Sequence, residues 1–347
     1  MTEKINIKNL TPSQLTAGMA EMGEQRHRTR QIMQWIWQKG AASFDEMTSL
    51  SLGLRSRLNE RFHIPATRVV GSVSSGSDGS QKFLLECEDG AVIEVVLMEA
   101  RGIFTLCVSS QVGCPLACSF CRTGTGGLER DLSTGEILDQ ILYFRLYHIP
   151  PRRRFNIVFM GMGDPLLNTA NVFPALEILN HEDGFALREK RITVSTIGLP
   201  VRIKELEKSG LKAGLAVSLN AVDDDTRKRL MPAAAGIKET LVAAEEYAVA
   251  RKMRATLEYV LIAGVNDSPR DAGMLASLTA GRPFKINIIP FNEWEGCDLK
   301  RPDEESIDRF IEILLPTAPA VTVRRSQGGD IGAACGQLKA NRDEYGL

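Results

Sequence analysis

The sequence has no long apolar run, few histidines and almost no net charge. No stretch approaches the roughly 18 uninterrupted apolar residues that a membrane-spanning helix needs. The segment from Met1 to Leu10 is polar and lacks the apolar centre of a signal peptide. The chain is therefore expected in the cytoplasm, away from the membrane. With only 4 histidines, a histidine-rich metal site is not favoured.

The net charge of −1 gives the whole molecule no attraction toward nucleic acid. If RNA is bound, local basic patches must attract it. Candidate patches are Arg26–Arg30, Arg152–Arg154 and the pair Arg324 and Arg325. Each of them is equally compatible with a solvated face of the protein.

The 7 cysteines are an odd number in a chain without a secretion signal, which argues against a disulfide framework. In a reducing compartment, clustered cysteines indicate metal or redox chemistry instead. The isolated Cys87 and Cys297 are interpreted as small buried apolar residues without a chemical role.

The hydrophobic pattern changes twice along the chain. Residues 11–65 are predicted to be helical, with one helix from Thr11 and another over 26–39. Residues 83–98 fit a β-hairpin that turns at Asp89-Gly90. From about residue 104, short apolar strands alternate with helices. Strands are expected at 155–160, 192–196, 215–219, 256–262, 285–289 and 321–324, and helices at 134–147, 201–208, 239–251 and 304–315.

This alternation predicts an α/β fold whose parallel sheet closes fully or partly into a (β/α) barrel. We predict three units: an N-terminal helical accessory domain over residues 1–65, a β-hairpin linker over 66–100 and a partial-barrel catalytic domain over 101–347. In such barrels the chemistry gathers at the carboxyl ends of the strands.

Three cysteines form a C-x₃-C-x₂-C run, at Cys114, Cys118 and Cys121. Thiolates are the usual ligands of iron–sulfur clusters. Three ligands leave one iron of a [4Fe–4S] cluster open to chelate S-adenosylmethionine (SAM), whose reductive cleavage gives a 5′-deoxyadenosyl radical. The alternative, a structural zinc site, usually shows a second cysteine pair or a histidine pair. The run therefore predicts a radical SAM enzyme with one [4Fe–4S] cluster.

Longer segments around this run carry a more specific pattern. They are Arg26-His-Arg-Thr-Arg-Gln-Ile, Cys107-Val-Ser-Ser-Gln-Val-Gly, Met160-Gly-Met-Gly-Asp-Pro-Leu-Leu-Asn, Val194-Ser-Thr-Ile-Gly, Ala216-Val-Ser-Leu-Asn-Ala, Ile289-Pro-Phe-Asn and Gly329-Asp-Ile-Gly-Ala-Ala-Cys335-Gly-Gln-Leu. Together they resemble the RlmN/Cfr family of radical SAM RNA methyltransferases, and its RlmN branch more than its Cfr branch. The resemblance covers nearly the whole chain.

The resemblance implies methylation of carbon 2 of adenosine in the peptidyl-transferase loop of 23S rRNA, and of the adenosine 3′ of the anticodon in some tRNAs. It implies two SAM molecules per methylation, one as methyl donor and one as radical source. It also implies that Cys335 carries the methyl group, that Glu94 accepts the proton of carbon 2, and that Cys107 frees the product through a transient Cys107–Cys335 disulfide. An electron donor and a disulfide reductant would be partners of a protein that is expected to be a monomer.

By the same resemblance, SAM contacts are expected at the strand ends. Asp164 stands where relatives often carry Glu, so its carboxylate reaches less far toward the SAM amino group. Asn220 replaces a frequent His and keeps hydrogen bonding without charge. The expected SAM-binding residues are Gly163, Asp164, Ser195, Ser218, Leu219, Asn220 and Asn292.

Three alternatives stay open. The first is a Cfr-like enzyme that methylates carbon 8 and confers ribosomal antibiotic resistance. The second is a non-catalytic iron–sulfur protein that binds RNA or transfers electrons without SAM. The third is a radical SAM enzyme for a small metabolite, which would not need a basic N-terminal domain. Within residues 1–65, Trp35 and Trp37 belong either to an RNA-docking surface or to the core.

Overall fold

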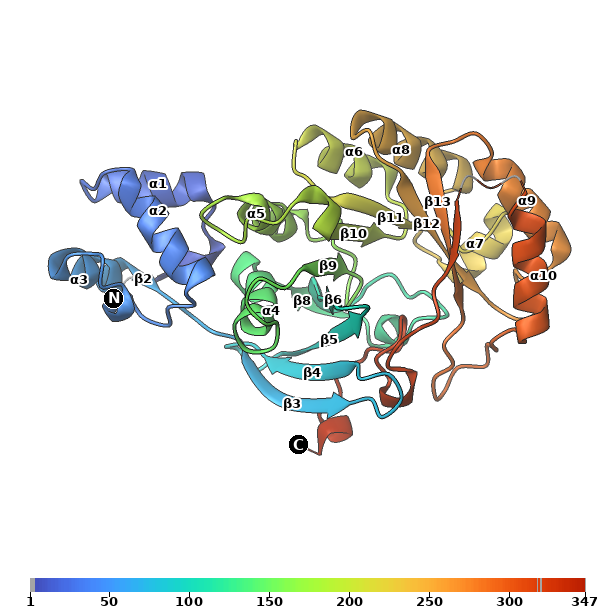
Figure 1. Cartoon of the computed structure of the whole chain (residues 1–347), viewed down its shortest axis with the longest axis horizontal. Coiled ribbons are helices and arrows are strands. Elements are labelled where there is room, and N and C mark those ends of the chain that lie inside the picture. The colour runs from blue at the N-terminus through green and yellow to red at the C-terminus, as the bar shows by residue number, and fades with distance from the viewer. Residues whose placement is uncertain (1–3, 317, 319, 347) are drawn as a thin grey trace.

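The chain opens with a group of helices, which Figure 1 shows at one end of the molecule. The structure, a computed structural model, describes residues 4–316, 318 and 320–346. The short strands of this group, β1 and β2, pair in parallel and bring its two ends together. Its elements are β1 (Ile5–Asn6), η1 (Ile7–Asn9), α1 (Pro12–Glu21), α2 (His27–Met33), η2 (Gln34–Gln38), η3 (Phe44–Glu46), α3 (Leu52–Arg61) and β2 (Phe62–His63).

The two tryptophans of this group have different environments. Trp37 is buried in the core, with its ring centroid 5.7 Å from that of Phe185. Trp35 is partly buried; its indole Nε1 donates to Ser49 Oγ at 2.8 Å, and Lys39 Nζ lies 3.6 Å from the ring centroid. Trp37 therefore stabilises the fold, and Trp35 is the tryptophan that remains near the surface.

A 10-stranded sheet forms the centre of the molecule, in the order β14-β13-β12-β11-β10-β9-β6-β5-β4-β3. Neighbours from β6 to β14 are parallel, and those from β3 to β6 are antiparallel. The edge strands β14 and β3 have no further neighbour within the described residues, so the barrel is open. The strands are β3 (Arg68–Ser74), β4 (Gln81–Glu86), β5 (Val92–Ala100), β6 (Ile103–Cys107), β9 (Phe155–Phe159), β10 (Ile192–Thr196), β11 (Gly214–Ser218), β12 (Ala255–Leu261), β13 (Phe284–Pro290) and β14 (Val321–Val323).

Helices connect the parallel strands; Figure 1 shows α6 and α8 above β10–β12, and α9 and α10 beside β13. Ser133 is the N-cap of helix α4 and forms a capping box with Glu136, which satisfies two backbone N–H groups. The helices are α4 (Thr134–Tyr147), α5 (Thr169–Asn180), α6 (Pro200–Lys208), α7 (Asp224–Leu230), α8 (Ile237–Ala250), α9 (Pro269–Thr279) and α10 (Glu304–Leu314). Shorter elements are β7 (Gln111–Gly113), η4 (Arg122–Gly126), β8 (Leu128–Asp131), η5 (Glu189–Arg191), η6 (Gly329–Ile331) and η7 (Arg342–Tyr345).

The predicted hairpin is confirmed as β4 and β5, which pair antiparallel around Asp89-Gly90. Gly90 has φ +87°, and the Ala91 backbone N donates to Asp89 Oδ1 at 3.1 Å. Because β5 also pairs with β6, the hairpin extends the same sheet that forms the barrel. The α/β class and the partial barrel are confirmed, while the division into three domains stays a prediction. No helix of the described residues is long and apolar enough to cross a membrane.

Candidate active site

The cysteine run occupies the loop that begins at the end of β7. Gly113, just before the run, has φ +80°, and a Cβ there would lie 2.1 Å from the Gly127 carbonyl oxygen, so the position requires glycine. The Cys114 backbone N donates to that same oxygen at 2.8 Å, and the Ser119 backbone N donates to the Leu230 carbonyl at 2.9 Å. Backbone hydrogen bonds therefore hold the loop at both its start and its middle.

The three cysteines of the run line one cavity at the carboxyl ends of the parallel strands. Burial raises the pKa of Cys114 to about 11 and also raises the pKa of Cys118 and Cys121. Buried thiols become thiolates only beside a compensating positive charge, and iron supplies that charge in a cluster. Three cysteine donors facing one cavity therefore fit a [4Fe–4S] cluster that keeps one iron open.

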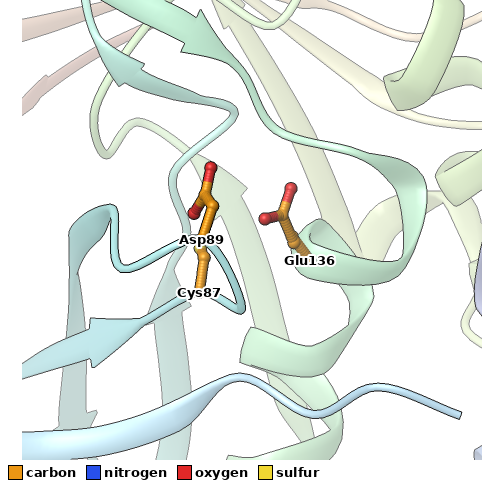
Figure 2. Close-up of side chains that lie close together, drawn as sticks. All are labelled: Cys87, Asp89 and Glu136. Atoms are coloured by element: carbon orange, nitrogen blue, oxygen red, sulfur yellow. The ribbon is translucent and has the colours of Figure 1, made fainter.

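Another group of ligand-type side chains lies away from this cavity, where Cys87, Asp89 and Glu136 converge (Figure 2). It is the one set in the described part of the chain whose three ligand atoms lie within 4.8 Å of one another. The Arg130 guanidinium donates to Asp89 at 2.7 and 2.8 Å and to Glu136 at 2.8 and 3.0 Å. Because the Arg130 cation already neutralises both carboxylates, the group is not a metal site. Its ion pairs connect the β4–β5 hairpin to α4.

Most of the predicted site residues share the cavity of the cysteine run. Gly163, with φ +89°, lets the loop after β9 approach Gln111, whose Cβ would lie 2.5 Å from a side chain at this position. The Asn292 side chain also lines the cavity and donates to the Cys335 carbonyl at 3.1 Å. The predicted residues that line it are Cys114, Cys118, Cys121, Gly163, Asp164, Ser195, Ser218, Asn292 and Cys335.

Asp164 is buried in the wall of this cavity. Its Oδ2 accepts hydrogen bonds from Thr196 Oγ1 and the Ile197 backbone N, both at 2.9 Å, and its Oδ1 accepts one from the Leu166 backbone N at 2.9 Å. Burial raises the pKa of Asp164 to about 6, although these three donors favour the ionised form. A carboxylate has about four acceptor positions, so one remains for a cation in the cavity.

Leu219 and Asn220 do not line this cavity. The fully buried Asn220 accepts a hydrogen bond from the Val260 backbone N at 2.8 Å, and its Nδ2 donates to Met231 Sδ at 3.3 Å. Its side chain therefore joins the ends of β11 and β12. The sequence pattern gave no sign of this structural use, and a ligand role for either residue stays a prediction.

Arg227 of α7 has a central position that the sequence analysis did not identify. Only 1% exposed, its guanidinium donates to the carbonyls of Ile197 at 2.7 Å, Ser218 at 2.9 Å and Ala235 at 2.8 Å, and also to that of Leu219. Burial lowers the pKa of Arg227 to about 10. The residue fastens the carboxyl ends of β10 and β11. One arginine among the charged residues of a polar helix gives no sequence signal for such a role.

Cys335, on the loop that follows β14, lines two cavities. One is the cluster cavity, and the other is a smaller cavity, the cysteine cavity, whose wall includes Cys107 at the end of β6. All seven cysteines are free thiols. Burial raises the pKa of Cys107 to about 12, an effect that the charge of Arg324 opposes. Two cysteines that are far apart in the sequence thus meet beside the cluster cavity.

Glu94 on β5 is fully buried and lines neither cavity. Its Oε2 accepts from the Lys339 and Ala340 backbone N atoms at 2.7 and 3.0 Å. Its Oε1 accepts from Tyr345 Oη at 2.8 Å and pairs with Lys82 Nζ at 2.9 Å. Burial and the neighbouring charge of Glu94 raise the pKa of Tyr345, which keeps its hydroxyl a donor. The carboxylate therefore fastens the C-terminal tail to the sheet.

Family models match both the N-terminal and the central part of the chain. Residues 5–64 match the ribosomal RNA large subunit methyltransferase N-terminal domain, and residues 108–274 match the radical SAM superfamily. The dual-specificity RNA methyltransferase RlmN of Pelobacter propionicus is 43% identical over 345 residues, which cover 99% of this chain and 98% of that protein. RlmN of Campylobacter jejuni is 43% identical over 360 aligned positions, covering 99% of this chain and 100% of that protein.

A solved structure agrees with these matches over almost the full length. The radical SAM methyltransferase from Sphaerobacter thermophilus superposes with a TM-score of 0.89 at 39% identity, covering 97% of this chain and 100% of the other. Members of the radical SAM superfamily use SAM and a [4Fe–4S] cluster, and the cavity lined by three cysteines offers the donors that such a cluster needs. The chain is therefore a SAM-dependent methyltransferase that belongs to the RlmN family of RNA methyltransferases.

Proposed function

We propose that this enzyme methylates carbon 2 of adenosine in the peptidyl-transferase loop of 23S rRNA, and of the adenosine 3′ of the anticodon in some tRNAs. One observation carries the proposal: Cys335 lines both the cluster cavity and the cavity that it shares with Cys107. A cysteine in this position can receive a group on the cluster side and be attacked by a second thiol on the other. The RlmN relatives, named dual-specificity RNA methyltransferases, support the two RNA substrates.

The cavity residues would hold the cofactors. Cys114, Cys118 and Cys121 would ligate the cluster, and Gly163, Asp164, Ser195, Ser218 and Asn292 would contact SAM. The free acceptor position of Asp164 suits the ammonium group of SAM. When bound, the cluster and two SAM molecules per methylation supply a methyl group and a carbon-centred radical.

Two cysteines would then carry the methyl group and release the product. The Cys335 thiolate would be the nucleophile that receives a methyl group from the sulfonium of SAM, whose sulfur would leave as a thioether. After the methyl carbon has bonded to carbon 2 of the base, Cys107 attacks the Cys335 sulfur as a thiolate. The bond from that sulfur to the methylene carbon breaks and a Cys107–Cys335 disulfide forms. The methylene carbon keeps the electron pair of the broken bond and takes up a proton, so that the methylated adenosine is freed. An external reductant must restore both thiols.

Glu94 is the proposed acceptor of the proton from carbon 2. Three of its four donors belong to the C-terminal tail, at Lys339, Ala340 and Tyr345. The proposed role therefore requires the tail to release the carboxylate toward the base. The tail follows Cys335 directly in the chain, so a movement of the Cys335 loop would be transmitted to these three hydrogen bonds.

RNA would dock on the N-terminal helical domain, residues 1–65, with 66–100 linking it to the catalytic domain, 101–347. Arg26 is exposed and makes no ion pair within the described residues, while Arg28 pairs with Glu24 at 3.7 Å and Arg30 with Asp183 at 2.9 Å. The target base must leave its stack, which costs a few kcal/mol. We place the enzyme in the cytoplasm as a monomer, served by an electron donor and a disulfide reductant.

The test is mass spectrometry of RNA nucleosides after anaerobic incubation of cluster-loaded enzyme with SAM, a reductant and unmodified ribosomal RNA or tRNA. Wild type should form 2-methyladenosine, Cys335→Ala should form none, and the control Cys297→Ala should match wild type. Formation of 8-methyladenosine would assign the enzyme to carbon 8 instead. Absence of any methyladenosine with an intact cluster and competent RNA would refute the proposed function.

A further inference from the structure

Three cavities follow one another through the inside of the barrel. The cluster cavity and the cysteine cavity share Met160 and Cys335 as lining residues. The cysteine cavity and a third cavity share Met98, Arg324 and Gln327. These three side chains therefore form part of the boundary between the third cavity and the space next to the cysteine pair.

The first and third cavities lie at opposite ends of the same strands. The third is lined by Asn156 and Thr193, each the second residue of its strand, β9 or β10. The first is lined by Met160 and Ser195, which come at the other ends of these strands. Thr105 of β6 also lines the third cavity and, two residues before Cys107, points to the same side of the sheet. A molecule entering at the amino end therefore reaches the cysteine pair without passing the cluster.

The third cavity is basic. Lys190 and Arg191 of η5 and Arg324 after β14 line it, and none of its described lining residues is acidic. Lys190 is exposed, and Arg191 Nη1 donates to the neutral Asn156 at 2.9 Å. Arg324 Nη1 donates to Met160 Sδ at 3.4 Å. The charge of Arg324 is partly offset by the nearby Glu258 carboxylate. The excess positive charge therefore rests on Lys190 and Arg191, and such a concave surface concentrates small anions.

We propose that this third cavity is the entry site of a low-molecular-weight thiol that carries a carboxylate or sulfonate group and reduces the Cys107–Cys335 disulfide. The inference rests on the proposed function, to which the disulfide belongs. The thiolate attacks the Cys107 sulfur, the S–S bond breaks, and Cys335 leaves as a thiolate beside the Arg324 cation. A second thiol molecule attacks the sulfur of the first, which releases Cys107 as a thiolate and forms the reagent's own disulfide. Two thiols are oxidised, and both cysteines then take up a proton.

The burial of Cys107 favours a small thiol over a protein reductant. Cys107 is 7% exposed and is the last residue of β6. Seen from the third cavity, it lies beyond Met98 and Arg324. A protein disulfide reductase must bring its own cysteine into contact with the disulfide, which would require the loop that carries Cys335 to open. A reagent of a few non-hydrogen atoms has to pass only side chains such as Met98, Arg324 and Gln327, which line both cavities.

The experiment uses cluster-loaded, full-length enzyme that has been mildly oxidised under anaerobic conditions. The Cys107–Cys335 disulfide is quantified by alkylation and peptide mass spectrometry, with no methylation assay involved. Its reduction rate is measured with mercaptoethanesulfonate, mercaptoethanol and cysteamine, and is compared per thiolate after correction for nucleophilicity. The sulfonate should react about tenfold faster than cysteamine at low salt, and added salt should reduce that preference.

Two variants test whether the preference for the sulfonate thiol arises from the third cavity. Lys190→Ser combined with Arg191→Ser should remove most of it, while Arg188→Ser should keep it. Arg188 is a matched control because it precedes η5, is exposed, and does not line the third cavity. Equal rates for the three thiols, equal loss in the control, or reduction only by a protein reductase would each overturn the inference alone. If the two cysteines cannot form a disulfide, the product-release step of the proposed function fails together with this inference.

Discussion

The two ends of the barrel treat charge in opposite ways. At the carboxyl end, Asp164 has three hydrogen-bond donors, and Arg227 donates to four carbonyl oxygens. At the amino end, Lys190 and Arg191 face a cavity without an acidic partner among its described lining residues. Buried charges with several hydrogen-bond partners hold loops in one arrangement, which a precise radical reaction needs. Charges near solvent with few partners contribute little to holding the structure in place, but they attract ions.

Among the changes that test this comparison, removal of a cluster cysteine should have the largest effect, because it abolishes RNA methylation at the carboxyl end. Cys118→Ala should lose bound iron and sulfide, and methylation should fall by roughly 10⁴-fold or more, as expected for a member of a unit that acts together. Iron analysis, the visible absorption spectrum and RNA methylation check this. Cys297→Ala, a change at a partly buried cysteine outside the run, is the control. A Cys118→Ala protein with a full iron content would contradict the cluster assignment.

The buried pair of Lys82 and Glu94 should have the next largest effect, on stability. Lys82→Met leaves a fully buried carboxylate without its cation, which should lower the free energy of unfolding by about 3–5 kcal/mol. Adding Glu94→Gln should recover much of this loss, because no buried charge then remains unpaired. Urea denaturation of the three proteins gives the values. Equal stability of Lys82→Met and wild type would show that this network does not hold the tail.

A substitution at Arg227 tests whether a buried charge with several hydrogen-bond partners holds the loops of the carboxyl end in position. Arg227→Met leaves four carbonyl oxygens without their donor and should cost about 3 kcal/mol of unfolding free energy. SAM should also bind more weakly, because the loops at Ile197 and Ser218 line its cavity. Urea denaturation and calorimetric SAM titration measure both effects. Weaker SAM binding without a loss of stability would place Arg227 in ligand binding instead of loop positioning.

Asp164 should affect SAM affinity more than stability. Asp164→Asn removes the charge that we assign to the SAM ammonium, and the Kd for SAM should rise about tenfold. Because burial raises the pKa of Asp164 to about 6, protonation should weaken SAM binding as the pH falls through 6. The same raised pKa means that protonation at low pH favours the folded state at this position. An Asn variant with wild-type affinity, or with the same pH profile, would remove Asp164 from SAM binding.

The smallest effect is expected at the amino end. Arg191→Ser loses one hydrogen bond to Asn156 at a partly exposed site, which should cost at most about 1 kcal/mol of unfolding free energy. Measured beside Arg227→Met, it compares one arginine from each end of the barrel. A loss as large as that of Arg227→Met would mean that the amino end is as tightly organised as the carboxyl end.

Local patterns predicted much of this structure. The spacing of Cys114, Cys118 and Cys121 and the alternation of strands and helices depend on near neighbours in the sequence, and the cavity and the barrel follow from them. Arg227 and Lys82 could not be predicted, because their roles depend on partners supplied by other elements. For Asn220 the sequence motif correctly identified the end of a strand, but it did not predict the direction in which the side chain points.

An open barrel with a route at each end also affects the order in which substrates bind and products leave. RNA would approach the cluster cavity from the carboxyl end, and a thiol would approach the cysteine pair from the amino end. Product and reductant could then occupy the protein together, because neither blocks the path of the other. Steady-state rates would follow a sequential scheme with a ternary complex, instead of a ping-pong scheme in which the modified RNA must dissociate before the enzyme is regenerated.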